Sequence, residues 1–139
     1  MRIEEDMKLD YKDILIRPKR STLGSRKDVD LERGFTFRNY KGPRPMHRHY
    51  RGTPIMASNM DGVGTFEMAD TLATGGIFTC LVKTYSVSEL VSYFDQDDRS
   101  HDPARTEFVA MSIGITDADH KKFRDVYEQV NDRLKYVCI

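Results

Sequence analysis

The residues best suited to chemistry follow two short apolar stretches of the chain. Asn59, Met60 and Asp61 come directly after the first apolar run, and Lys83 follows a second run that ends at Val82. A lysine at the end of a strand can bind a cofactor phosphate or stabilise the charge of a leaving group. The Asn and Asp side chains can fix a turn, and the methionine can pack on a purine ring. The plainer alternatives are a structural turn and a surface lysine.

A second candidate pair, Ser25 and Arg26, lies in a basic part of the chain. Residues 17–51 hold eleven Lys and Arg against three acidic residues, a balance of +8, although the whole chain has no net charge. A hydroxyl beside a bidentate guanidinium suits a phosphate group. The alternative is a solvated loop with a polar turn after Gly24. No nucleic-acid-binding motif accompanies the charge, so we expect no nucleic-acid partner.

Hydrophobic periodicity after residue 53 predicts alternating strands and helices. The expected strands cover residues 55–57, 77–82, 108–113 and 135–139. Helices are expected to begin after the capping residues Thr65, Ser86 and Thr116. Such alternation predicts an α/β fold with parallel pairing, in which Ser112 and Gly114 would lie at the same rim as the candidate residues. Four strands with three helices make half of an eight-stranded barrel or a small open sheet.

The organisation changes near residue 53, within what we expect to be a single partial domain, 1–139. Residues 1–53 form an irregular basic segment with a short strand that ends at Pro18, and residues 54–139 form the first βα units. No apolar run approaches the ~20 residues of a membrane span, and the acidic start lacks a signal peptide, so a cytoplasmic location is expected. His47 and His49 lack further ligands, so no metal site is expected.

Several motifs, taken in order, resemble the N-terminal region of GMP reductase. The matching segments are residues 1–6, 11–21, 30–33, 59–61, 63–66 and 136–139. Lys83 and the pair Tyr85-Ser86 fit the same register, and an apparent insertion occupies residues 41–51. IMP dehydrogenases carry a related Met-Asp turn, but the arginine-rich start and the Val-Gly-Thr-Phe continuation at 63–66 are closer to the reductase.

The resemblance implies a TIM barrel that assembles as a tetramer and converts GMP to IMP and ammonia with NADPH. It implies a catalytic and cofactor-binding role for Lys83, and NADPH binding by Ser25 and Arg26 across a subunit boundary. By the same resemblance, the substrate-binding residues Asn59, Met60 and Asp61 shape the purine pocket. The chain departs from the family pattern at three positions: Gly62 replaces a threonine, which removes a hydroxyl and loosens the backbone, and Val82 and Thr84 replace histidines.

A barrel of this kind needs ~250 residues, more than the chain contains. The family's catalytic cysteine lies in a loop after the middle of the barrel, whereas Cys80 and Cys138 fall in predicted strands. We therefore expect an N-terminal fragment or split subunit that is inactive alone. One alternative is a non-catalytic interaction protein that pairs with a complementary half or a homologue, because half a barrel leaves strand edges uncovered. Another is an IMP dehydrogenase-like oxidoreductase fragment.

Overall fold

The computed structural model describes residues 6–42, 49–95 and 105–139 of the chain. The chain divides into two units, Met1–Asp30 and Leu31–Ile139. His47 lies outside the described residues, as do residues 43–48 of the apparent insertion, whereas His49 is the first residue of a strand and not part of a loop.

The described part of the first unit, residues 6–30, contains two short 3-10 helices, η1 (Tyr11–Asp13) and η2 (Arg26–Asp28). The Asp10 carboxylate caps η1 by accepting a hydrogen bond from the first backbone N–H of that helix, 2.7 Å away. The prediction of a short strand that ends at Pro18 is wrong. The segment after η1 pairs with no strand among the described residues of this unit, and Leu15 there is 98% exposed. A strand needs a neighbour for its backbone hydrogen bonds, and Asp10 bonds local backbone instead.

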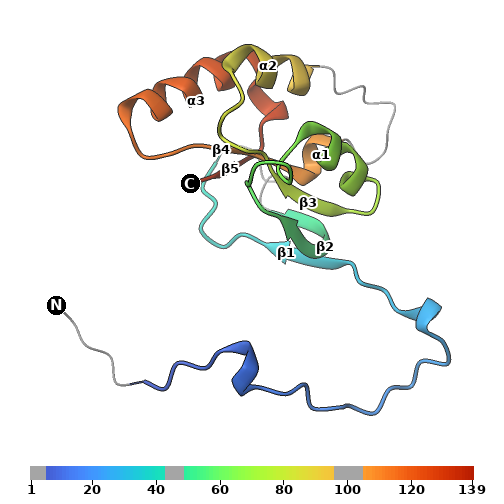
Figure 1. Ribbon diagram of the computed structural model, residues 1–139. Coiled ribbons are helices and arrows are strands. Elements are labelled where there is room, and N and C mark those ends of the chain that lie inside the picture. The colour runs from blue at the N-terminus through green and yellow to red at the C-terminus, as the bar shows by residue number, and fades with distance from the viewer. Residues whose placement is uncertain (1–5, 43–48, 96–104) are drawn as a thin grey trace. The chain divides into compact units, whose positions relative to one another are not determined.

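The second unit is built on a five-stranded sheet in the order β1-β2-β3-β4-β5. The strands are β1 (Arg33–Thr36), β2 (His49–Ala57), β3 (Ile77–Cys80), β4 (Val109–Ser112) and β5 (Tyr136–Cys138). β1 runs antiparallel to β2, and each later strand is parallel to the one before it. Figure 1 shows this sheet with its helices, and the α/β class predicted from the sequence is confirmed.

Within the described residues, three α-helices connect the parallel strands. The helical elements are α1 (Phe66–Ala73), α2 (Val87–Asp95), α3 (Asp117–Val130) and the 3-10 turns η4 (Arg105–Phe108) and η5 (Asn131–Arg133). The Thr65 hydroxyl accepts the backbone N–H of Met68 at 3.2 Å. Ser86 and Glu89 form a capping box at the start of α2, in which each side chain accepts a hydrogen bond from the other residue's backbone N–H. Thr116 and Asp119 form the same motif at the start of α3. All three predicted helix starts are therefore confirmed.

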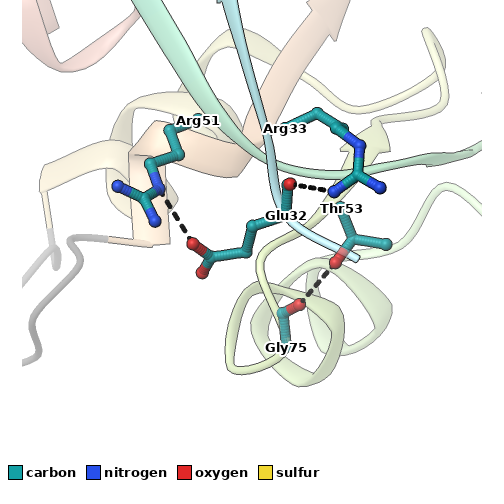
Figure 2. A network of polar contacts seen from close by, with 5 residues as sticks. All are labelled: Glu32, Arg33, Arg51, Thr53 and Gly75. Atoms are coloured by element: carbon teal, nitrogen blue, oxygen red, sulfur yellow. Dashed lines mark hydrogen bonds and ion pairs between the residues drawn. The ribbon is translucent and has the colours of Figure 1, made fainter. Parts of the chain in front are cut away.

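A hairpin of β1 and β2 falls inside the segment expected to be irregular. Figure 2 shows the polar contacts around it: Arg51 pairs with the Glu32 carboxylate at 2.8 Å, and Arg33 donates to the Glu32 carbonyl. Thr53, later in β2, donates its hydroxyl hydrogen bond to the carbonyl of Gly75, 3.3 Å away. The Arg51–Glu32 pair thus connects the two sides of the hairpin, whereas the contact of Arg33 is with its own sequence neighbour.

Side chains alternate between the two faces of the parallel strands, and both faces carry apolar residues. In β4, Val109 and Met111 join the cluster that packs against the helices, whereas Ala110 joins a second cluster with Phe78 and Phe108. All four β4 residues are buried, as is usual for a parallel strand covered on both faces. The helix-side cluster is the larger of the two and contains these residues: Ala69, Leu81, Leu90, Tyr93, Phe94, Val109, Met111, Ile113, Val126, Val130 and Leu134.

Candidate active site at the carboxyl edge of the parallel strands

The ends of β2 and β3 bring two groups of predicted site residues to one edge of the sheet. The strands are parallel and paired, with Ala57 opposite Thr79, so the segments that follow them leave the sheet at the same edge. Asn59 and Asp61 in the first segment and Lys83 in the second are all exposed. Polar side chains at the carboxyl ends of parallel strands are the usual location of α/β active sites.

The turn after β2 is closed by one backbone carbonyl. The Met60 carbonyl accepts hydrogen bonds from the N–H groups of Val63, at 3.0 Å, and Gly64, at 2.8 Å. Asp61 and Gly62 therefore form the tip of the turn. Gly62 has a φ of 75°, in the left-handed region where a β-branched residue is strained. Glycine at this position thus suits the turn's backbone.

Gly64 ties this turn to the end of β3. Its carbonyl accepts the N–H of Val82 at 2.8 Å. A Cβ at Gly64 would lie 2.4 Å from the Cys80 carbonyl oxygen, so the approach requires glycine. Because Lys83 directly follows Val82, this hydrogen bond fixes the backbone of the lysine beside the turn that carries Asn59.

Lys122 of α3 also contacts the backbone of the segment that follows β3. Its Nζ donates a hydrogen bond to the Lys83 carbonyl, 2.7 Å away. Partial burial lowers the pKa of Lys122, and Lys83 acts in the same direction, while Asp119 and Glu89 oppose the shift. The charges of the carboxylates that begin α3 and α2 thus favour the charged form of Lys122, against its partial burial.

Asp119 adds a carboxylate to this cluster of charges. The Thr116 hydroxyl donates to Asp119 Oδ2 at 2.6 Å, and the Thr116 N–H donates to the same oxygen at 3.2 Å. These hydrogen bonds lower the pKa of Asp119, with smaller contributions from Gly114 and Lys83. The carboxylate that caps α3 therefore also faces the backbone of the β4 end and the charge of Lys83.

Ser112 at the end of β4 supplies a further polar atom. It is 3% exposed, and its Oγ has no hydrogen-bond partner among the residues that the structure describes. A buried hydroxyl without a partner carries a desolvation cost, which a bound polar group would relieve. Ser112 is thus a candidate contact for a ligand that reaches this edge.

Curated proteins give the chain a family context, although no protein-family model matches it. The GMP reductase of Shigella boydii serotype 18 is 47% identical over all 139 residues, as is that of Escherichia coli O81. The GMP reductase of Klebsiella pneumoniae subsp. pneumoniae is 48% identical over the same length. The chain is homologous to part of GMP reductase. It spans 37% of the length of each of these relatives, in agreement with the predicted N-terminal part of a GMP reductase.

The residues predicted to bind nucleotides lie in both units of the chain. Asn59, Asp61 and Lys83 follow strands that end at one edge of the sheet, whereas Ser25 and Arg26 belong to the other unit. There Ser25 caps η2: its hydroxyl accepts the N–H of Lys27 at 3.2 Å. The predicted polar turn is therefore present at Ser25, and the cofactor role of the pair stays a prediction.

Sequence reasoning missed Lys122, the residue that contacts the Lys83 backbone. It lies on a charged helix beside Lys121, where a lysine is usually solvated, and its partner is 39 residues earlier in the chain. No local pattern marks such a contact.

The described residues contain no group of three or more His, Cys, Asp or Glu side chains arranged to hold a metal ion. Among the helices that the structure describes, none combines the length and apolar character required to cross a membrane.

Proposed function

We propose that the chain forms the first part of a GMP reductase-type oxidoreductase, which converts GMP to IMP and ammonia with NADPH. In this proposal Asn59, Met60 and Asp61 line the purine pocket. Lys83 contacts the nicotinamide cofactor and takes part in the chemistry. The observation that carries the proposal is the hydrogen bond from Val82 to Gly64, because it joins both groups at the carboxyl edge of the sheet.

The proposed complete fold is a TIM barrel, to which β2–β5 and α1–α3 contribute the first strands and helices. Support comes from the sequential order of the four parallel strands and from apolar residues on both of their faces. The helix-side cluster would then lie between barrel and outer helices, and the second cluster would face the barrel interior. The complete enzyme would be a tetramer, in which Ser25 and Arg26 bind the NADPH phosphate of a neighbouring subunit.

NADPH would supply the hydride that replaces the amino group of GMP. The chain's own contribution is a positive charge on an ordered backbone: Lys83 is held through its N-terminal neighbour by Gly64 and through its carbonyl by Lys122. An ammonium group held in this way stabilises negative charge on a bound phosphate or on the reacting ring. Ser112 adds a buried hydroxyl to the same edge.

The chain alone is expected to bind nucleotide weakly and not to turn it over. The cysteine that the family uses lies in a later loop, and Cys80 and Cys138 lie in β3 and β5 instead. The test is calorimetric binding of GMP, IMP and NADPH to the purified chain, together with an assay of NADPH oxidation in the presence of GMP. Binding that weakens in Lys83→Ala but not in Lys121→Ala supports the proposal. NADPH oxidation by the chain alone contradicts the predicted inactivity, and equal binding by both variants contradicts the role of Lys83.

A second candidate function, pairing with another chain, is favoured by an open apolar hollow on the second face of the sheet. The hollow has a volume of about 480 Å³. Its lining residues are Phe35, Phe37, Tyr50, Thr53, Pro54, Ile55, Met56, Phe78, Cys80, Ala110, Tyr136, Val137 and Cys138. An exposed apolar surface of this kind is typical of an interface. Light scattering after size-exclusion chromatography tests this: a stable monomer with a cooperative thermal transition would contradict it.

IMP dehydrogenase-like chemistry is the alternative within the same reaction class. Preference for IMP and NAD over GMP and NADPH in the binding experiments would favour it.

A further inference from the structure

Three aromatic rings from three parts of the chain form a stack beside the candidate site. Phe66 lies between the two others, with its ring centroid 4.0 Å from that of Tyr85 and 4.4 Å from that of Tyr93. The ring planes are nearly parallel, at 16° and 11°. Phe66 is the first residue of α1, Tyr85 lies in the segment between β3 and α2, and Tyr93 belongs to α2. The stack therefore joins these three elements through side chains alone.

The inner end of the stack is fixed by the core. Tyr93 is buried in the helix-side cluster, and its hydroxyl donates a hydrogen bond to Asp70 Oδ1 of α1, 3.0 Å away. Phe66 and Tyr85 are half-buried and pack against the same cluster. Because the inner ring is held by packing and by a hydrogen bond, it gives the outer rings a fixed surface on which to stack.

The outer two rings belong to the two segments that carry the candidate site. Phe66 comes two residues after Gly64, at the end of the turn, and Tyr85 comes two residues after Lys83. The hydrogen bond from the Val82 N–H to the Gly64 carbonyl, at 2.8 Å, joins the same two segments. That bond holds the chain just before the lysine, and the stack holds it just after. Lys83 is thus enclosed between two connections to one turn.

Such a stack has one structural role and one role specific to the site. Aromatic pairs stabilise a fold beyond the area that they bury, so a purely structural stack would stabilise the unit as a whole. A stack that also orders the lysine lowers the conformational entropy that a ligand must remove on binding. We propose that Phe66 and Tyr85 are positioning residues that hold Lys83 in place for its ligand. This proposal rests on the proposed function, in which Lys83 contacts the nicotinamide cofactor.

Hydrogen exchange of single amides in the 139-residue chain tests the ordering without any ligand. The Val82 amide reports the connection between the two segments. The Ile113 amide, which bonds the Cys138 carbonyl at 2.9 Å, reports the sheet at β4 and β5. Tyr85→Leu removes the outer ring but keeps an apolar side chain. It should accelerate exchange at Val82 by about 3- to 10-fold relative to Ile113, because one aromatic contact is lost locally.

Two further variants separate the ring from other properties of the side chain. Tyr85→Phe keeps the ring and should give the exchange ratio of the wild type. Phe66→Leu removes the central ring from the other segment and should raise the ratio as Tyr85→Leu does. General destabilisation would accelerate both amides together, so the ratio distinguishes local ordering from a purely structural contribution.

Calorimetric binding of NADPH tests the link to the lysine. Tyr85→Leu should weaken binding by about 3- to 10-fold in the wild-type chain. The same substitution should have no further effect in a Lys83→Ala background, because it acts through the lysine. Tyr127→Leu is the matched control: this tyrosine also stacks on a phenylalanine, Phe123, but within α3, and its loss should leave the affinity unchanged.

Two results would overturn the proposal. One is an exchange ratio of Val82 to Ile113 that keeps its wild-type value in both Tyr85→Leu and Phe66→Leu. The other is an equal loss of NADPH affinity from Tyr85→Leu with and without Lys83, which would show that the ring does not act through the lysine. Absence of NADPH binding by the wild-type chain would contradict the proposed function instead, and the exchange ratio would then decide alone whether the stack orders the segment of Lys83.

Discussion

The side chain of Lys122 and the backbone of Lys83 are joined by a hydrogen bond of 2.7 Å from Nζ to the carbonyl oxygen. This contact connects α3 to the segment after β3, across 39 positions of the sequence. It gives a lysine on an amphipathic helix a structural task that its neighbour Lys121 does not share. The pair therefore offers a matched comparison.

Replacing Lys122 by methionine should destabilise the chain by about 1 kcal/mol, because the Lys83 carbonyl loses its side-chain donor while the apolar stem is retained. Lys121→Met should change the free energy of unfolding by less than about 0.5 kcal/mol, as for an ordinary surface substitution. Urea denaturation of the two variants measures both values. Equal effects of the two substitutions would show that the contact has no energetic role.

A methyl group at Gly64 should disrupt the connection between the turn and β3. Its Cβ would lie 2.4 Å from the Cys80 carbonyl oxygen and 2.8 Å from the Val82 nitrogen, and both are backbone atoms. We expect Gly64→Ala to lower the free energy of unfolding by roughly 1–3 kcal/mol, the usual cost of overpacking.

Gly75→Ala is the control for this substitution. The nearest atom to an added Cβ there is the Leu72 carbonyl oxygen at 3.6 Å, an ordinary contact. Chemical denaturation should find that variant neutral or slightly stabilised. A Gly64→Ala variant as stable as Gly75→Ala would refute the proposed close approach.

The hydroxyl groups of two tyrosines should contribute differently to the free energy of unfolding. Tyr93 donates to Asp70 Oδ1 at 3.0 Å, whereas the buried Tyr50 hydroxyl has no hydrogen-bond partner among the described residues. Tyr93→Phe should therefore cost about 1 kcal/mol, and Tyr50→Phe should be neutral or stabilising. Thermal or urea unfolding of the two variants tests this contrast. A larger loss in Tyr50→Phe than in Tyr93→Phe would contradict it.

The carboxylate that caps α3 should make stability depend on pH in a defined direction. Hydrogen bonds from Thr116 lower the pKa of Asp119 in the folded chain below the value of about 3.9 expected when unfolded. The contribution is therefore fully present above pH ~4 and is lost as the pH falls through the lowered folded value.

Asp119→Asn should accordingly be less stable than the wild type at neutral pH, with a difference that shrinks as the pH falls below about 4. Unfolding curves measured from pH 7 down to pH 2.5 test this expectation. Glu89, whose pKa is lowered by Ser86 in the same way, should behave alike in Glu89→Gln. A difference that stays constant across this range would show that the cap's charge is irrelevant.

Local signals predicted the helices, and long-range contacts account for what they missed. Thr65, Ser86 and Thr116 each bond backbone within three residues, so their sequence context is sufficient to locate a helix start. The β1–β2 hairpin depends on pairing between Phe35 and Tyr50, whose rings lie 6.1 Å apart but come from distant positions. Pairing of this kind leaves little trace in either strand alone.

For the candidate site, too, the sequence predicts the positions of the residues but not the contacts between them. The positions of Asn59 and Lys83 at strand ends follow from the alternation of strands and helices. Their connection through Gly64 depends on the parallel register of β2 and β3 and on the absence of a side chain, which no periodicity encodes.

Tyr50 lies edge-on to Phe78, Phe108 and Tyr136, with ring centroids 5.7, 5.9 and 6.3 Å away. The chain contains no tryptophan, so its tyrosines dominate the near-ultraviolet spectrum. Ordered contacts between tyrosine rings give a circular dichroism signal that disappears when the rings rotate freely. The part of this signal that comes from Tyr50 is thus an intrinsic optical probe for the attachment of the β1–β2 hairpin, which can be followed without any label.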